Sequence, residues 1–172
     1  SRQASLHKAN NMEKIAAGEH RSFMHAVVDG NGIGVNVLAV RFIAGRAPSK
    51  ELRDQIMWGK YLLKTQNAES RFFNEYVRNL AGPVIFGGDL NATPSSKIIR
   101  SLSRYATDVY LTDHLFGSNT FRTNFPSLRL DYIYCRDSAV PVRSERLKIV
   151  ASDHFPLMAR FQVQEPGCLA IR

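Results

Sequence analysis

The stretch Val84-Ile85-Phe86-Gly87-Gly88-Asp89-Leu90-Asn91 decides the fold of this chain. Its three leading apolar residues predict a short buried strand, and the Gly-Gly pair predicts a tight loop after it. We expect the glycines to let the backbone come close to whatever Asp89 and Asn91 hold. Carboxylate and amide oxygens suit a hard divalent cation such as Mg²⁺. An Asx turn that closes a strand explains an isolated Asp-x-Asn equally well.

Upstream of this stretch, the pattern predicts a β-hairpin followed by helices. Two β-type runs, 21–28 and 33–42, flank Asp29-Gly30-Asn31-Gly32, and Asp-Gly and Asn-Gly are strong hairpin-turn signals. Apolar residues then recur at helical spacing, which predicts one helix over 50–65 and another over 70–80.

Downstream, one helix and several strands are expected. The ranges are 95–102 for the helix, 108–115 and 120–124 for loops or edge strands, and 130–135, 146–150 and 156–163 for strands. The order β-β-α-α-β-α-β-β-β predicts a layered α/β (α+β) fold. Residues 1–20 read as a polar segment, a loop or a short helix near 11–17. The domain is expected over 21–163, and 164–172 as a tail.

Two further motifs place polar groups within or beyond apolar strands. Asp131 interrupts an apolar run, where a carboxylate costs free energy unless it is paired. An ion pair with Arg129 or another Arg and the orientation of an imidazole both explain it. In Ser152-Asp153-His154, neighbouring side chains of an extended backbone point in different directions, so Asp153 suits a metal and His154 a phosphate. A remote Asp behind His154, such as Asp131, would hold it in one tautomer. Alone, Ser-Asp-His is a turn in most proteins.

Composition limits the class of protein and of partner. The 172 residues include 23 Lys and Arg against 15 Asp and Glu, a net charge of +8. This excess favours an anionic partner such as nucleic acid or phosphorylated lipid head groups. With 44% apolar and 22% charged residues, disorder and coiled coil are unexpected. No apolar run approaches the roughly 18 residues of a membrane span. The two cysteines imply neither a disulfide framework nor a Cys-rich zinc site.

Five basic residues are candidates to follow a phosphate backbone: Lys97, Arg100, Arg104, Arg122 and Arg129. The first three are spaced i, i+3 and i+7, which predicts one helical face. A solvated face explains each of them singly.

Together the three polar motifs resemble the last three signatures of the endonuclease/exonuclease/phosphatase superfamily. The segments are 87–94, 129–133 and 152–156, and the resemblance extends over about 21–163. The superfamily includes abasic-site endonucleases, DNase I, neutral sphingomyelinases, inositol polyphosphate 5-phosphatases and deadenylases. The helix at Arg53-Asp54-Gln55 is also similar to the family's Arg-x-x-Gln region. The resemblance implies a DNase I-like layered sandwich and Mg²⁺- or Mn²⁺-dependent hydrolysis of a phosphoester.

The resemblance also implies roles for individual residues. Asp89 would orient or deprotonate the attacking water and contact metal, and Asn91 would hold water or phosphate. Asp153 would be a metal ligand, while His154, held by Asp131, would bind the scissile phosphate.

Two departures from the family pattern qualify these expectations. Arg41 stands where the family has a His, and it could hold a phosphate or be a simple strand-end charge. The family's first half, with its metal-binding Glu, is not recognisable, because Glu13 and Glu19 follow no apolar strand. We therefore expect only the later part of the two-sheet domain, completed by a homodimer or a second polypeptide.

Three functions stay open at this stage. They are a nuclease acting on nucleic acid, a phosphatase or lipid phosphodiesterase, and a catalytically silent basic module that binds nucleic acid or a partner. The compartment is not predicted.

Overall fold

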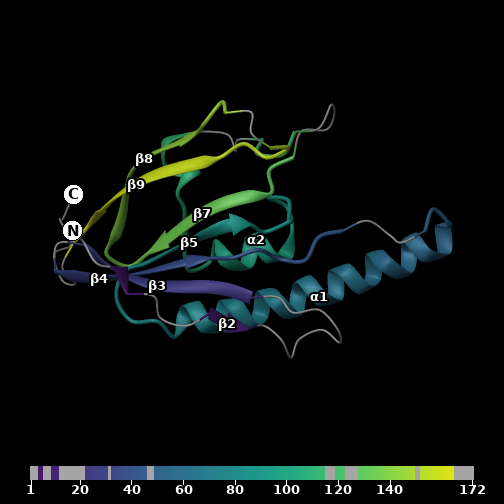
Figure 1. Cartoon of the computed structure of the whole chain (residues 1–172), viewed down its shortest axis with the longest axis horizontal. Helices are drawn as coiled ribbons and strands as arrows, with labels where there is room; N and C mark the ends of the chain where they lie inside the picture. Colours follow the sequence, from purple (N-terminus) through teal and green to yellow (C-terminus); the bar gives the residue numbers. More distant parts are fainter. Residues whose placement is uncertain are drawn as a thin grey trace.

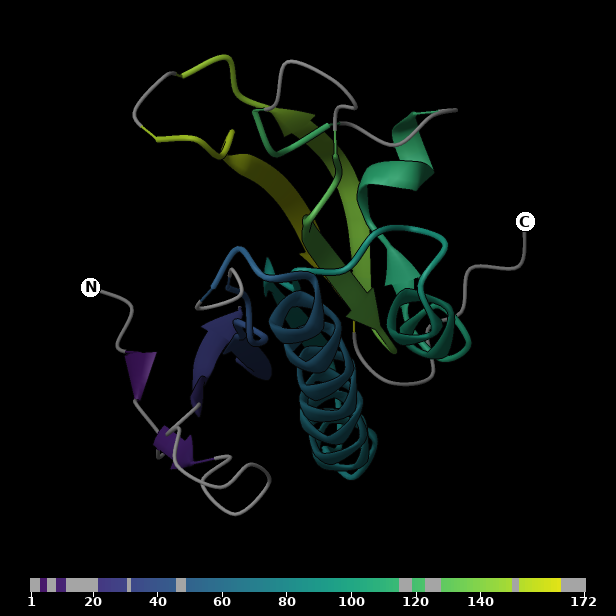
Figure 2. The ribbon, with the colours of Figure 1, turned by 90° about the vertical axis from the view of Figure 1, so that its right-hand side faces the viewer.

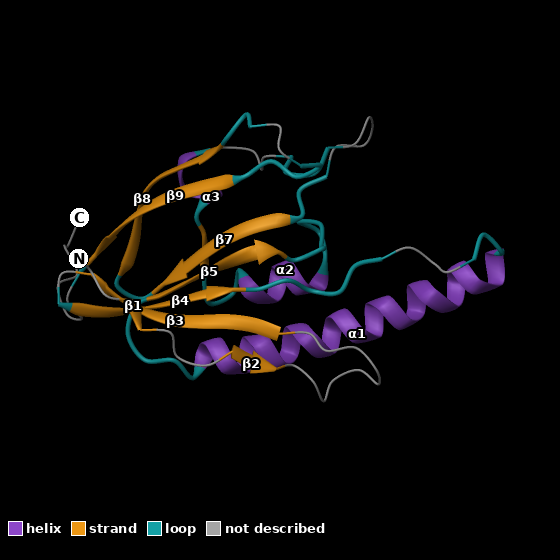
Figure 3. Ribbon diagram, in the orientation of Figure 1, coloured by secondary structure: helices purple, strands orange, loops and turns teal. Residues whose placement is uncertain are grey.

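The computed structural model describes residues 4–5, 9–11, 22–30, 32–45, 49–114, 119–122, 128–149 and 152–164. Its strands form two sheets (Figures 1 and 3). The larger sheet has the order β1-β3-β4-β5-β7-β6, and β2 also pairs with β3. Its strands are β1 (Ala4–Ser5), β2 (Ala9–Asn11), β3 (Ser22–Gly30), β4 (Ile33–Ala39), β5 (Val84–Asp89), β6 (Thr107–Asp108) and β7 (Asp131–Arg136). The smaller sheet pairs β8 (Ala139–Arg146) with β9 (Leu157–Val163).

The helices are α1 (Leu52–Arg78), α2 (Lys97–Leu102) and α3 (Tyr110–Asp113). α1 and α2 cover one face of the larger sheet, and β8 and β9 lie on the other side (Figures 1 and 2). The side chains of β7 alternate accordingly, since Tyr132 and Tyr134 join the helix-side core while Ile133 and Cys135 contact the β8–β9 side. None of the described helices is long and apolar enough to cross a membrane. The predicted layered α/β fold is confirmed.

The predicted hairpin is confirmed as β3 and β4, which pair antiparallel from Met24↔Ala39 to Gly30↔Ile33. Asp29 Oδ1 accepts a hydrogen bond from the Gly32 N–H at 2.6 Å, and Gly32 has φ +85°. The residue between the two glycines lies outside the described residues.

The Gly87-Gly88 pair belongs to β5 rather than to the predicted loop, and it lets the neighbouring strands pack closely. A Cβ on Gly88 would lie 2.1 Å from the Val40 carbonyl oxygen, and Gly88 has φ +144°. A Cβ on Gly87 would lie 2.5 Å from the Tyr132 carbonyl oxygen. Because β5 runs between β4 and β7, the missing side chains let both neighbouring backbones approach.

The two helices expected over 50–65 and 70–80 are one continuous helix, α1. The polar run between them looked like a break, but Gln66 and Glu69 are buried on its sheet side. Farther along, Phe73 packs edge-on against the rings of Phe23 and Phe86, with centroids 5.2 and 5.5 Å apart. The helix therefore continues because its buried face includes polar side chains with backbone partners.

Other boundaries differ from the prediction. The strand expected at 146–150 is instead β8, which the pattern missed because Pro141 and several charged residues interrupt its alternation. The polar segment 1–20, expected as a loop or a short helix near 11–17, contributes β1 and β2. Residues 12–17 lie outside the described residues, as does most of the expected tail. The range 108–115 contains the end of β6 and α3, and the helix at 95–102 is confirmed as α2.

Candidate active site

The larger sheet places two carboxylates opposite each other. Asp89 is the last residue of β5 and Asp131 the first residue of β7, and the two are register partners in the antiparallel pair. The backbone continues this alignment beyond the strands, since the Leu90 N–H donates to the Leu130 carbonyl at 2.9 Å. Strand pairing itself therefore sets the separation of the two side chains.

His154 joins the two carboxylates from the loop between β8 and β9. Its Nδ1 lies 2.8 Å from Asp131 Oδ2. One ligand atom from each of Asp89, Asp131 and His154 lies within 4.8 Å of the others. Asp131 and His154 also line a hollow of about 320 Å³ together with Gly88 and Phe155. The His154 ring packs beside Phe121, with centroids 4.9 Å apart.

The pKa of the Asp89 carboxyl is raised by its surroundings. Burial raises its pKa above the usual 3.8, and the negative charge of Asp131 raises it further. The Asn91 backbone N–H, His154 and Arg41 act in the opposite direction. Arg41 Nε lies 3.5 Å from Asp89 Oδ2, and the Arg41 side chain is 69% exposed. The guanidinium is thus beside the carboxylate and still open to an incoming anion.

Asn91 lies at the turn after β5, with φ +46°. Its backbone N–H donates to Asp89 Oδ1 at 3.0 Å, which is the Asx-type contact that the sequence left open. Its side-chain Nδ2 donates to the Phe42 carbonyl at 2.9 Å. This bond fixes the orientation of the amide.

Asp153 does not belong to the compact group of described residues. It is exposed, its Oδ1 accepts from the Ser152 hydroxyl at 3.2 Å, and its carbonyl oxygen accepts from the Arg122 N–H at 2.8 Å. The structure therefore brings Asp89, Asp131, His154 and Arg41 together and leaves Asp153 at the rim.

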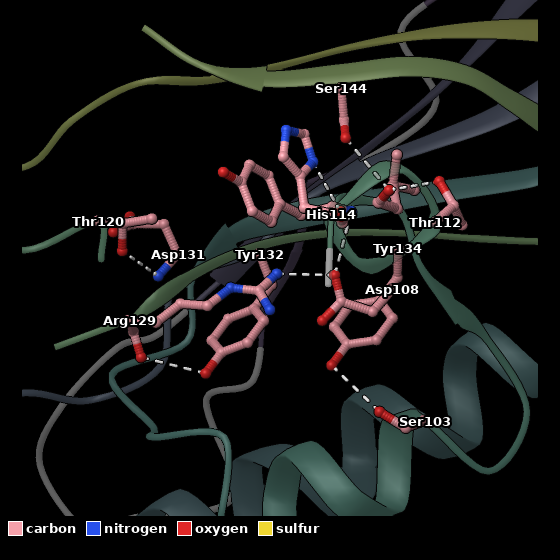
Figure 4. A network of polar contacts seen from close by, with 12 residues as sticks. Ser103, Asp108, Thr112, His114, Thr120, Arg129, Asp131, Tyr132, Tyr134 and Ser144 are labelled. Atoms are coloured by element: carbon pink, nitrogen blue, oxygen red, sulfur yellow. Dashed lines mark hydrogen bonds and ion pairs between the residues drawn. The ribbon is translucent and has the colours of Figure 1, made fainter. Parts of the chain in front are cut away.

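Thr120 is a positioning residue that the sequence analysis missed. It is fully buried, and its Oγ1 accepts hydrogen bonds from the backbone N–H groups of Leu130 and Asp131, each at 3.0 Å (Figure 4). Its carbonyl oxygen accepts from the Phe155 N–H at 2.7 Å. Thr120 thus joins the start of β7 to the loop of His154. A single threonine between Asn119 and Phe121 carries no signal of this role in the sequence.

Gln66 and Glu69 support the site from α1. Gln66 Nε2 donates to the carbonyls of Ile43 at 2.9 Å and Asn91 at 3.1 Å, and Glu69 Oε2 accepts from the Ile43 N–H at 2.8 Å. Gln55, in the segment similar to the family's Arg-x-x-Gln region, is exposed, and its amide donates to the Lys50 carbonyl. The sequence did contain a signal for Gln66 and Glu69, because they are polar residues on the otherwise apolar face of a helix.

Arg129 is a structural residue, which corrects both roles considered for it. Its guanidinium donates to Asp108 Oδ1 at 2.7 Å, with side-chain exposures of 4% and 8% (Figure 4). It also lies over the Tyr132 ring, 4.4 Å from the centroid. It therefore pairs with Asp108 rather than Asp131, and it is too buried to follow a phosphate backbone.

The remaining basic candidates are exposed. α2 ends at Leu102, so Arg104 lies in the following turn and not on the same helical face as Lys97 and Arg100. The three nevertheless line one hollow of about 510 Å³, together with Ser101. The Arg122 guanidinium lies over the Phe155 ring at the rim of the site, 5.7 Å from its centroid.

Comparison with solved structures identifies molecules of the same fold. A humanized D. rerio TDP2 with 14 mutations is 16% identical with a TM-score of 0.68, and the match covers 93% of this chain and 68% of that chain. D. rerio TDP2 complexed with a single-strand DNA product is 13% identical with a TM-score of 0.66, covering 93% and 69%. A Bacteroides thetaiotaomicron mannosyl-6-phosphatase is 18% identical with a TM-score of 0.59, covering 92% and 67%.

This chain spans about two thirds of the length of those molecules, in agreement with the expectation of a partial domain. No curated protein matches the sequence. Residues 22–154 match the Endonuclease/Exonuclease/phosphatase family, a range that contains the hairpin, α1 and all three polar motifs. The chain therefore belongs to the Endonuclease/Exonuclease/phosphatase family.

Proposed function

We propose that this chain is a Mg²⁺- or Mn²⁺-dependent phosphodiesterase acting on nucleic acid. The observation that carries the proposal is the Asp89, Asp131 and His154 group, in which the three ligand atoms lie within 4.8 Å of one another. Membership of the family gives the reaction class, phosphoester hydrolysis. The activity of this chain, its substrate and the roles of its residues are the proposal.

His154 is assigned to the phosphate. Its Nδ1 faces the Asp131 carboxylate at 2.8 Å, so an Nδ1–H donates there and the tautomer is fixed. Nε2 is then the atom that meets a phosphate oxygen and stabilises its developing charge. Asp131 acts through His154 as a positioning residue.

The residues fit a divalent cation. Asp89 and Asp131 face each other across paired strands, and their mutual repulsion helps to raise the pKa of Asp89. Mg²⁺ accepts one or two carboxylates together with phosphate oxygens, so Asp89 can hold the ion while Asp131 orients His154. Asp89 would hold the ion, with Asp153 contributing directly or through water. A bound divalent ion neutralises phosphate charge and lowers the pKa of a bound water.

Arg41 and Asn91 are assigned to substrate binding. The exposed guanidinium of Arg41 can offer two parallel N–H groups to a phosphate. The Asn91 amide, held by its bond to Phe42, orients water or phosphate beside Asp89. Asp89 in turn accepts a proton from, or orients, the attacking water.

Nucleic acid is favoured as substrate by the net charge of +8 and by the solved TDP2 relative, which is complexed with a single-strand DNA product. A phosphomonoester is the second candidate, because another relative of the same fold is a mannosyl-6-phosphatase.

A second copy or another polypeptide completes the domain in this proposal. Within the described residues, the β8–β9 sheet has two strands, and Val142 and Met158 on it are 52% and 48% exposed. A two-stranded sheet is marginal without further strands or packing. Light scattering of the purified chain measures whether it self-associates.

The experiment is metal-dependent hydrolysis of bis(p-nitrophenyl) phosphate and of supercoiled plasmid. Asp89→Asn and His154→Ala should each lose at least about a hundredfold in kcat/KM, the scale of general acid–base and electrostatic contributions. His114→Ala is the matched control, because the His114 Nδ1–H donates to the Tyr110 carbonyl and the imidazole stacks on the Tyr110 ring, outside the site. Hydrolysis that persists without metal, or equally in both site variants, contradicts the proposal. Faster release of phosphate from p-nitrophenyl phosphate than of p-nitrophenol from the diester favours the phosphatase.

A further inference from the structure

All five basic residues of α1 lie on one stripe of the helix. They are exposed and are spaced seven, four, seven and seven residues apart: Arg53, Lys60, Lys64, Arg71 and Arg78. At about 100° per residue, these spacings place the five side chains within about 40° of one another around the helix axis. At about 1.5 Å per residue, the stripe is about 37 Å long.

Half of this stripe projects beyond the sheet, on the side of the candidate site. α1 has 27 residues and is about 40 Å long, whereas the six residues of β5 span about 20 Å. A short connection leads from the end of α1 to the start of β5, so the helix runs back along the strand and its first residues pass the Asp89 end (Figure 1). The buried residues of α1 begin only at Thr65.

The stripe adjoins the basic hollow of α2. Asn74, which lies beside the stripe, donates to the Ser101 hydroxyl at 3.1 Å, and Ser101 lines that hollow. Arg78 lies over the Tyr105 ring, 4.6 Å from its centroid, in the turn after α2. The stripe and the hollow therefore form one continuous surface with eight cations, the five of α1 and Lys97, Arg100 and Arg104.

Negative charge is nearly absent from this surface. Of the three carboxylates of α1, Glu69 is buried against the sheet and Asp54 points away from the stripe by its helical position. Glu75 flanks it, four residues after Arg71 and three before Arg78.

We infer that this surface binds the phosphate backbone of a nucleic acid and leads it to the candidate site. The inference rests on the proposed function, because it names the polymer that the site cuts. A straight row of cations of about 37 Å matches about one turn of a DNA duplex, which is 34–36 Å. Each Lys or Arg contact releases counterions from the backbone, which drives binding without sequence preference.

An anionic membrane is the rival partner, because Leu52, Ile56 and Leu63 are exposed beside the projecting part of the stripe. The cations continue past these residues, however, to Arg71 and Arg78 and on to α2, and the polar residues among them are Asn67, Asn74, Glu75 and Ser101. A membrane-bound helix would pair apolar residues with its cations along its whole length. The distribution of charge therefore favours a polyanion.

The test is binding of a fluorescein-labelled 20-base-pair DNA duplex by anisotropy, in EDTA, from 50 to 200 mM salt. A triple variant of the stripe, called the track variant, carries Lys60→Gln, Lys64→Gln and Arg71→Gln. The matched control is Arg143→Gln, Lys148→Gln and Arg160→Gln, which removes three exposed cations from β8, β9 and the loop after β8. The track variant should bind at least about tenfold more weakly at 50 mM salt, and its slope of log K against log salt should be shallower by about two to three. The control should bind like the wild type.

A reciprocal variant adds to the test, since Glu75→Gln removes the one flanking carboxylate and should tighten binding by about twofold or more. No duplex binding by the wild type, or equal losses in the track and control variants, overturns the inference. Binding to phosphatidylserine vesicles is measured for the same proteins. If the track variant loses vesicle binding but binds the duplex like the wild type, the inference is overturned and the surface is assigned to membranes. Binding is measured without hydrolysis, so the two ideas can fail separately. If the chain shows no hydrolysis but its duplex binding is weakened by the track variant and not by the control, only the proposed function is refuted.

Discussion

The two carboxylates of the candidate site are carried by paired strands, whereas its imidazole is carried by a loop. Asp89 and Asp131 are fixed by a register of six residue pairs between β5 and β7. His154 depends on a few contacts between residues 152–155 and 120–122. The difference shows that the sheet sets the spacing of the two negative charges, while the loop decides whether the imidazole meets them.

The part of the site that is carried by strands should be more sensitive to one added carbon atom than the part that is carried by the loop. Gly88→Ala places a Cβ 2.1 Å from the Val40 carbonyl oxygen at φ +144°, so β4 and β5 must separate. We expect a loss of at least about 3 kcal/mol in the free energy of unfolding, measured by urea denaturation. Gly59→Ala is the control, because nothing lies within 4 Å of its added Cβ and the helix should gain about 0.5–1 kcal/mol. A Gly88→Ala protein as stable as the wild type would contradict the packing described for β5.

Removal of the Thr120 link between strand and loop should have the next largest effect. Thr120→Val keeps the shape of the side chain but leaves the N–H groups of Leu130 and Asp131 without their acceptor. A fully buried group that loses its partner costs about 1–3 kcal/mol, and these two bonds are partly buried, so we expect a loss of about 2–4 kcal/mol in the free energy of unfolding and of at least about tenfold in kcat/KM. Thr112→Val is the control, because it removes one hydroxyl that donates to a single carbonyl. Equal effects of the two variants would show that Thr120 does not join the two parts.

The same division explains what could be predicted from the sequence. The strand-borne residues were found because apolar runs followed by glycine and Asp mark β5, and because Asp131 breaks an apolar run. The pairing of Asp131 with His154 was expected from the resemblance, and the structure shows it as a contact of 2.8 Å between Asp131 Oδ2 and His154 Nδ1. Thr120 could not be found, since its role depends on two backbone N–H groups about ten residues away in the sequence.

Buried polar residues account for the main errors. Gln66 and Glu69 looked like a break between helices because polar side chains normally mark exposed positions, yet both are buried against site backbone. Arg129 looked like a surface cation, but its ion pair with Asp108 and two tyrosine rings compensate its burial. Such partners are distant in sequence, and only the fold reveals them.

The negative charge of Asp89 should lower the stability of the folded protein. Its pKa is raised in the folded protein by burial and by Asp131, so the folded state favours the protonated carboxyl, and stability falls as pH rises past about 3.8. In EDTA at pH 7, we expect Asp89→Asn to be more stable than the wild type, on the scale of about 0.5–2 kcal/mol seen for single stabilising substitutions. The difference should vanish below pH 3.8. Thermal unfolding across pH 3–8 measures it, and a wild type that is the more stable at pH 7 would refute the assignment.

The smallest effect should come from a loop residue whose bonds are exposed. The Ser152 hydroxyl accepts from the His154 N–H at 2.9 Å and donates to Asp153 Oδ1 at 3.2 Å, and water can replace both bonds when Ser152→Ala removes the hydroxyl. We expect a change below about 1 kcal/mol in unfolding, together with a loss of a fewfold in kcat/KM because the loop backbone holds His154 less firmly. Urea denaturation and diester hydrolysis measured on the same preparation separate these two quantities. If Ser152→Ala instead lost as much stability as Thr120→Val, the loop would be as strongly fixed as the strands, and the contrast between the two parts of the site would not hold.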